Sequence, residues 1–214
     1  MTKNLDQYEK RETYRHGDLR RALLEAAVDL ARKGGKDAIV LREVTRRAGV
    51  APNAAYRHFK DLNSLLVAAA MAAQAELATY MERELANLKP MRDSTENARA
   101  QLRAVGTGYL KFAQAEPGLF RLAFSENADL SNAANPESTG SGGLTPFQLL
   151  SAALDSLVEA GDLPKERREA AEFFAWSAVH GLAVLIIDGP LRGLEKNATE
   201  TIGQRLIDMV ERGL

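Results

Sequence analysis

The sequence contains no cysteine and few of the residue patterns that carry catalysis. Without Cys, neither a disulfide framework nor a thiolate metal site is possible. The only histidines are His16, His58 and His180, and their scattered positions do not indicate a metal site. No G-x-S-x-G or H-E-x-x-H motif occurs, and the glycine-rich run at 140–143 follows no expected strand. We therefore predict no enzyme, no bound metal and no cofactor.

The N-terminus also lacks the apolar run that is typical of a signal peptide. We expect a cytoplasmic protein that is not associated with a membrane. The chain has 214 residues, of which 45% are hydrophobic and 27% charged, as in ordinary globular proteins. It is long enough to bury a sizeable core without help from a cofactor.

The net charge of −1 hides an asymmetry along the chain. Residues 1–60 contain 14 Lys and Arg against 8 Asp and Glu, whereas the remainder contains 14 against 21. A basic N-terminal part joined to an acidic body favours a module that faces nucleic acid. The alternative is a basic face that is simply solvated.

The segment 41–66 has the pattern of two short helices, a tight turn and a longer helix. Val44 and Ala48 lie on one face of the first short helix. Gly49 stands where a left-handed residue ends that helix, and Pro52 stands where the next helix can begin. This pattern is typical of a helix-turn-helix, whose second helix enters the major groove of DNA.

The second short helix is predicted to face the core through Ala55 and Phe59, which are four residues apart. Its other side would then face DNA, with Tyr56 contacting a phosphate and Asn53 a base. The candidate DNA-binding residues are Arg42, Asn53, Ala54, Tyr56, Arg57, His58 and Lys60.

The same residues carry a family resemblance. The segment is similar to the DNA-binding half of TetR-type transcriptional regulators, which share the core pattern A-G-V-S followed by Y-x-H-F. The positions that match in register are Arg42, Val44, Ala48, Gly49, Val50, Tyr56, His58, Phe59, Asp61, Leu65 and Leu66. The segment 14–20 also resembles the start of a large subgroup of these regulators. The resemblance implies binding to a double-stranded DNA operator.

Three positions depart from the family pattern. Leu41 stands where Thr or Ser is usual, Ala51 where Ser is usual and Leu62 where Lys is usual, and in the family these side chains tend to contact phosphates. An Ala at a capping position costs roughly 1 kcal/mol of helix stability. Loss of one cationic phosphate contact lowers the salt dependence of binding by about one unit of slope. We therefore expect DNA binding of modest strength.

The rest of the chain predicts an all-α body. Helices are expected at residues 18–32, 61–88, 95–114, from Pro117, from a Thr145 capping box to about Gly161, at 167–188 and at 194–212. The polar run 126–143 predicts a mobile loop. We assign residues 1–62 to a DNA-binding domain, with its helix-turn-helix at about 41–60, and residues 63–214 to a helical effector-binding and dimerisation domain.

The run from Trp176 to Gly181 resembles the W-x-x-x-H-G signature of one TetR subgroup, whose C-terminal domain is often called the WHG domain. His180 either hydrogen-bonds a ligand or packs between helices, and both interpretations stay open. Aromatic residues from several helices predict a cavity for a small apolar effector, although they are equally typical of a solid core. The candidate ligand-binding residues are Tyr109, Phe112, Phe120, Phe124, Phe147, Trp176 and His180, with Phe174 as a further aromatic.

The last two expected helices indicate a dimer. The segment 167–188 is apolar nearly all round, so it must pack on two sides, and the last helix has a heptad-like apolar seam. In TetR-type regulators the final two helices of each subunit form a four-helix interface, and the resemblance implies a homodimer here. The alternative is a hairpin within one chain. The candidate interface residues are Val184, Ile187, Ile202, Leu206, Met209 and Val210.

Together these features predict a repressor that a small apolar effector releases from its operator. The alternative is a DNA-binding protein that is controlled by a protein partner or has no effector. That alternative predicts a packed body rather than a hollow one.

Overall fold

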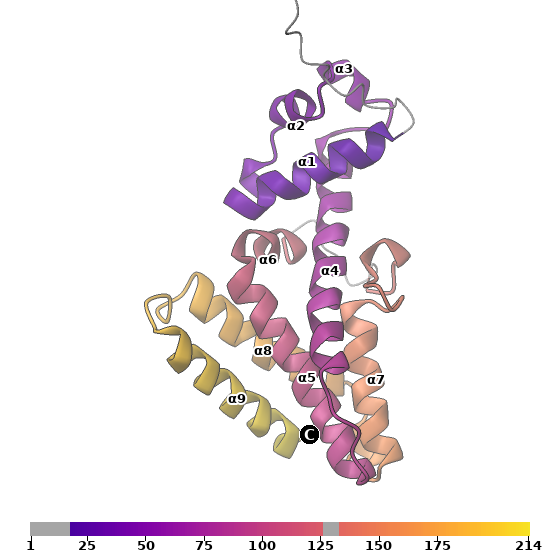
Figure 1. Ribbon diagram of the computed structural model, residues 1–214, viewed down its shortest axis with the longest axis vertical. Coiled ribbons are helices and arrows are strands. Elements are labelled where there is room, and N and C mark those ends of the chain that lie inside the picture. The colour runs from indigo at the N-terminus through magenta and orange to yellow at the C-terminus, as the bar shows by residue number, and fades with distance from the viewer. Residues whose placement is uncertain (1–17, 126–132) are drawn as a thin grey trace, which may run out of the picture.

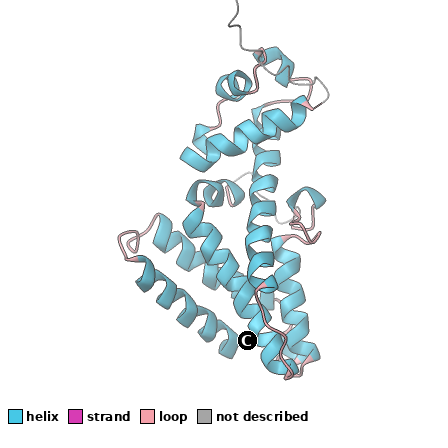
Figure 2. Cartoon of the chain, viewed as in Figure 1, coloured by secondary structure: helices cyan, strands magenta, loops and turns pink. Residues whose placement is uncertain are grey.

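The computed structural model describes residues 18–125 and 133–214, and the regular structure in these ranges is entirely helical (Figure 2). The predicted all-α fold is confirmed. The head contains α1 (Leu19–Gly34), α2 (Leu41–Arg47) and α3 (Pro52–Ala55). From the head, α4 (Leu62–Ala86) runs along the long axis into the body (Figure 1). The body adds α5 (Ser94–Ala115), α6 (Pro117–Ala123), α7 (Pro146–Glu159), α8 (Ala171–Ile187) and α9 (Lys196–Gly213).

Local side-chain chemistry sets several helix starts. Asp61 accepts a hydrogen bond from the Ser64 amide at 2.7 Å, and the Ser64 hydroxyl oxygen accepts one from the Asp61 amide at 3.2 Å. Thr145 and Gln148 form the same reciprocal capping box at the start of α7. Both caps satisfy amides that have no partner inside the helix. The predicted caps at Asp61 and Thr145 are therefore confirmed.

Two expectations about the body need correction. The helix expected from Arg167 begins instead at Ala171, because the chain first forms a 3-10 turn, η4 (Lys165–Arg167), and then passes through a left-handed Ala170 with φ 60°. The segment 133–143, which we expected to be mobile, is held against α4, while residues 126–132 lie outside the described residues.

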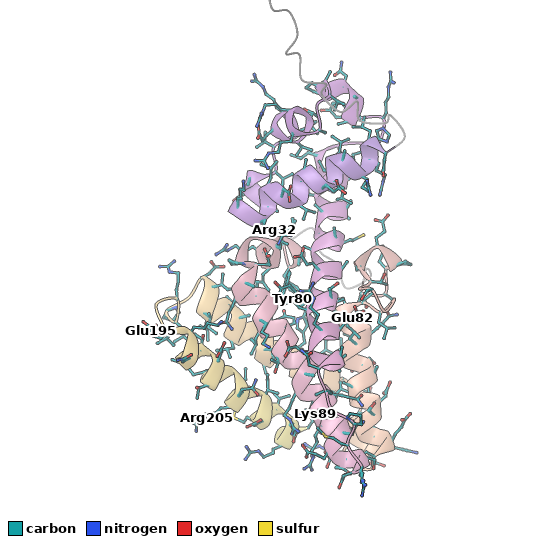
Figure 3. The ribbon with its side chains drawn as sticks, viewed as in Figure 1. Arg32, Tyr80, Glu82, Lys89, Glu195 and Arg205 are labelled. Carbon is teal, nitrogen blue, oxygen red and sulfur yellow. The ribbon has the colours of Figure 1, made fainter. Side chains whose placement is uncertain are left out.

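The anchor of the segment 133–143 is Glu82 of α4 (Figure 3). Its carboxylate accepts hydrogen bonds from the Ser141 hydroxyl at 2.7 Å and from the Gly142 amide at 2.9 Å. A short 3-10 turn, η3 (Pro136–Ser138), also packs against α4 and buries Ser138. Contacts with a distant helix therefore order a segment whose composition alone indicates a loop.

The central helix α4 packs against α1, α5, α6 and α7. Its mean hydropathy of 1.2 over 18 residues makes it, within the described part of the chain, the one helix long and apolar enough to cross a membrane. Leu65, Leu77 and Met81 on this helix are buried in the protein core, which accounts for that apolar composition. The core helix of a folded domain passes the same test.

The head is joined to the body by the C-terminal end of α1 as well as by α4. Arg32 forms ion pairs with Glu76 of α4, at 2.9 Å, and with Glu116 just before α6 (Figure 3). Gly118 of α6 lies so close to α1 that a Cβ atom on it would be 2.2 Å from the Ala31 carbonyl oxygen. Helix α6 is therefore in direct backbone contact with the head.

Candidate functional site

The apolar residues of the helix-turn-helix face the core, as their spacing along the helices predicts. Val44, Ala55 and Phe59 are all buried, with exposed fractions of 5% or less. Gly49 has φ 71°, the left-handed conformation that ends α2 and starts the turn. Helix α3 is shorter than expected, since it ends at Ala55 and the chain continues as a turn through Tyr56.

The candidate DNA-binding residues gather on the outer part of the head, on and around α2 and α3 (Figure 1). The Tyr56 side chain is 54% exposed although it lies beside buried Ala55. Ala54 is half-buried. The others are all exposed: Arg42, Asn53, Arg57, His58 and Lys60.

The charged residues on and after α2 and α3 fall into two sets. Glu43 pairs with Arg46 at 2.7 Å and with Arg47 at 3.0 Å, and these hydrogen bonds lower the pKa of its carboxyl to about 2. Two of the head's cations are thus already partly neutralised. Within residues 18–125 and 133–214, Arg42 and Arg57 have no ion pair, so their charge is available to a polyanion.

The family departures have structural counterparts. Ala51 is the N-cap of α3 and makes no side-chain capping bond, as expected of Ala. The N-cap of α2 is Val40, so Leu41 is the first helical residue rather than the cap. Leu62 is the first residue of α4 and is 37% exposed.

The body contains a cavity of about 280 Å³ among α4, α5, α7, α8 and α9. Among the residues that the structure describes, its wall is mainly aliphatic and aromatic and includes no Lys, Arg, Asp or Glu. The polar side chains on the wall are those of Gln74, Tyr109, Ser125, Trp176 and His180. Such a surface suits a small apolar molecule held by a few polar contacts.

The structure divides the predicted ligand-binding aromatics into two groups. Tyr109, Phe124, Phe147, Trp176 and His180 lie on the cavity wall. Phe112 and Phe120 do not: Phe112 is fully buried against the Tyr80 ring, and Phe120 lies behind His180 with its ring centre 5.3 Å from the imidazole.

The interpretation of Phe174 as a body-core or pocket aromatic is wrong, because its side chain is 67% exposed on the outside of α8. The sequence also missed the aliphatic part of the wall, which includes Leu77, Leu102, Val105, Leu150 and Ile207. Aliphatic wall residues have the same helical spacing as ordinary core residues, so no sequence signal separates them.

A hydrogen-bonded chain of three side chains forms the polar part of the wall. The Trp176 indole N–H donates to the Tyr109 hydroxyl oxygen at 3.2 Å, and that oxygen lies 2.7 Å from Nδ1 of His180. Burial raises the pKa of the Tyr109 hydroxyl and lowers the pKa of the His180 imidazole. The tyrosine is therefore protonated and the histidine is neutral at physiological pH.

The predicted dimer residues also separate into outward and inward sets. Val184, Ile202 and Met209 are exposed, Met209 to 65%, and Leu206 is half-buried. Ile187 is buried in the subunit core, and Val210 contributes to the cavity wall. Three large apolar side chains of α8 that we did not assign to the interface are exposed as well: Phe173, Phe174 and Leu185.

The head therefore has the form of a helix-turn-helix DNA-binding module, and it is attached to a helical body. Residues 23–69 match the family described as bacterial regulatory proteins, tetR family, and residues 102–210 match the tetracyclin repressor-like C-terminal domain. The chain belongs to the TetR family of DNA-binding transcriptional regulators. This is a family of regulators rather than of enzymes.

Similar solved structures cover nearly the whole chain. One is a protein of unknown function from a Rhodococcus species, with 28% identity, a TM-score of 0.70 and coverage of 95% of this chain and 98% of that chain. FadR from Bacillus subtilis, solved with stearoyl-CoA, has 14% identity and a TM-score of 0.65 over 91% and 98% of the two chains. The TetR family regulator PfmR from Thermus thermophilus has 19% identity and a TM-score of 0.53 over 90% and 98%.

Proposed function

We propose that this TetR-family regulator is a homodimeric cytoplasmic repressor that leaves its operator when a small apolar effector occupies the body cavity. The main observation in support of an effector is the cavity in the body. Side chains that line a hollow of about 280 Å³ forgo the packing contacts of a solid core, which is unfavourable unless a ligand fills the space. A DNA-binding protein without an effector has no use for it.

The exposed residues of the head support its role in operator binding. In this proposal Arg42, Arg57 and Lys60 contact phosphates together with the Tyr56 hydroxyl, while Asn53 reads a base edge. The division into a head of residues 1–62 and a body of residues 63–214 follows the start of α4.

The exposed apolar side chains of α8 and α9 support dimerisation. Val184 and Leu185 on α8 and Ile202 and Met209 on α9 lie at the surface of the single subunit. Arg205 projects from α9 away from the body (Figure 3). A two-fold axis through this face would bury the apolar side chains against their own copies. Two heads would then read half-sites about 34–36 Å apart.

Helix α6 supports a route from the cavity to the head. Phe124, at its end, lies on the cavity wall, while Gly118, near its start, touches α1 of the head. Arg121, between them, binds Asp188 beyond the end of α8 at 2.6 Å. A ligand that moves Phe124 would therefore act on the head and on the proposed dimer face through one short rigid element.

The complex of Bacillus subtilis FadR with stearoyl-CoA supports a ligand-responsive body in this fold. The described residues of the present cavity wall carry no charge, which favours a smaller and less polar molecule than an acyl-CoA. A regulator controlled by a protein partner stays as the alternative.

The test is a thermal-shift screen of small apolar molecules, followed by retardation of promoter DNA with each stabilising compound. A true effector raises the unfolding temperature and weakens DNA binding by about 5- to 150-fold. Compounds that stabilise the protein without changing DNA affinity would contradict effector release. A complete absence of stabilising compounds would favour the protein-partner alternative.

A further inference from the structure

We propose that the cavity selects an uncharged ligand with an acceptor oxygen, such as an aromatic or alicyclic ketone, and that Nε2–H of His180 donates the hydrogen bond that selects it. Tyr109 and Trp176 act as positioning residues that fix the proton on Nε2. This inference rests on the proposed effector-binding function, and it specifies the chemistry of the effector.

The direction of the hydrogen bonds follows from what each group can donate. The indole N–H of Trp176 is a donor only, so the Tyr109 oxygen accepts from it at 3.2 Å. The single hydroxyl proton of Tyr109 is then directed to Nδ1 of His180 at 2.7 Å. A neutral imidazole that accepts at Nδ1 carries its proton on Nε2.

The opposite direction of the hydrogen bond between His180 and Tyr109 is less favourable. If Nδ1 of His180 donated, the Tyr109 oxygen would accept two hydrogen bonds and its own proton would need a further acceptor. Among the described residues, Tyr109 has no such acceptor. Tyr109 is buried and His180 is only half-buried, so the arrangement that pairs the tyrosine proton and leaves the unpaired proton on the histidine is favoured.

The Nε2–H of His180 has no partner in the part of the chain that the structure describes. The imidazole is held between the rings of Phe120, 5.3 Å away and nearly parallel, and Phe124, 4.9 Å away and edge-on. It contributes to the cavity wall in this aromatic frame. A ligand oxygen that accepts from this donor therefore gains affinity over a hydrocarbon of the same shape.

Ser125 supplies a second, independent indication of a polar ligand. Its hydroxyl oxygen is buried and has no hydrogen-bond partner among the described residues, and the residue lies on the same cavity wall. Buried hydroxyls in folded proteins are nearly always paired. The oxygen itself has almost no accessible surface, so a ligand or its water molecule pairs with it only when the Ser125 side chain turns toward the cavity.

The wall also excludes charged ligands. Its described residues include no cationic side chain, and the histidine among them, His180, is neutral. Moving a carboxylate or phosphate into such surroundings costs far more than one neutral hydrogen bond returns. The volume limits size as well: an engineered cavity of about 150 Å³ binds benzene, so about 280 Å³ holds roughly eleven non-hydrogen atoms.

The experiment compares three probes of ten or eleven non-hydrogen atoms, which the cavity can hold: tetralin, 1-tetralone and the anion 3-phenylpropanoate. Binding to the full-length protein is followed through the fluorescence of Trp176, the only tryptophan. We expect the ketone to bind roughly tenfold more tightly than the hydrocarbon, as one buried hydrogen bond of typical strength provides. The anion should bind at least about 100-fold more weakly than the ketone, because a buried charge without a partner is far costlier than an unmade hydrogen bond.

Variants separate the hydrogen bond from general packing. His180→Leu should abolish the preference for the ketone and leave tetralin affinity within a few-fold of wild type. Tyr109→Phe should reduce the preference by less, because the tautomer is no longer fixed. His58→Leu is the matched control, since it removes an exposed histidine of the head and should leave the preference unchanged.

The outcomes distinguish the two proposals. If tetralin and tetralone bind equally, or if the preference survives in His180→Leu, the role of His180 is wrong while effector binding stands. Tight binding of the anion would overturn the exclusion of charge. If no probe binds, the proposed ligand chemistry is wrong, and the thermal-shift screen of other apolar molecules decides separately whether effector binding fails as well. Should the variants not fold, nitrogen chemical shifts of the wild-type His180 ring decide, because a proton found on Nδ1 would overturn the inference.

Discussion

The contact between α6 and α1 predicts a large effect for a small substitution, Gly118→Ala. An added Cβ atom would lie 2.2 Å from the Ala31 carbonyl oxygen and 2.7 Å from that of Arg32. Cβ atoms in proteins essentially never come within 3.0 Å of such a neighbour, and both neighbours are backbone atoms of a helix, so α6 and α1 must move apart. Overpacking of this kind typically costs about 1–3 kcal/mol.

The cost should appear in thermal unfolding. For a chain of this size, 1 kcal/mol shifts the unfolding temperature by about 2–4 °C, so we expect Gly118→Ala to lower it by about 2–12 °C. Because the displaced contact joins head and body, operator affinity measured well below the unfolding temperature should change as well. Scanning calorimetry and DNA retardation measure the two effects separately.

Gly108→Ala is the matched control for Gly118→Ala. A Cβ atom at Gly108 would lie 2.6 Å from the Met81 Cα atom, which makes the same kind of clash between α5 and α4 inside the body. It should lower the unfolding temperature but leave operator affinity near wild type. An unchanged unfolding temperature in Gly118→Ala would refute the close contact. Equal effects of both variants on DNA binding would refute its role in positioning the head.

Four further predictions concern DNA binding and assembly. Tyr56→Phe should weaken operator and random DNA equally, whereas Asn53→Ala should change sequence preference by about 1–3 kcal/mol; retardation assays that show the reverse would contradict both roles. Leu62→Lys should tighten DNA binding and steepen its salt slope by about one unit, and an unchanged slope would mean that this position does not reach a phosphate. Met209→Glu places a charge on a side chain that is 65% exposed in the single subunit, so the variant should fold. Sedimentation should show monomers, because the charge would be buried in the proposed interface. Dimers of this variant would exclude the α8 and α9 face as the dimer interface. The pKa of Glu43 is lowered to about 2, so the stabilisation from its ion pairs with the two arginines is complete above the ordinary glutamate pKa and is lost as the pH falls toward about 2. Glu43→Gln should free both cations and tighten DNA binding at neutral pH, and weaker binding would show that Glu43 holds them in place for DNA.

The features that the sequence determined by itself are local. Asp61 and Ser64, and likewise Thr145 and Gln148, are three residues apart, so their capping boxes depend on nothing outside one helical turn. The turn at Gly49 requires only a left-handed conformation that glycine adopts without strain. The buried face of the helix-turn-helix follows from helical spacing. These short-range rules were enough to identify the head and its exposed residues.

The cavity and its polar chain were decided by tertiary structure. Helix α8 is apolar nearly all round, so its periodicity could not show that Trp176 faces the cavity while Phe174 faces outward. Tyr109 lies 67 residues before Trp176 and 71 before His180, and only the packing of α5 against α8 brings the three side chains into hydrogen-bond contact. A hydrogen bond depends on distance in space, and residue spacing along separate helices does not encode it.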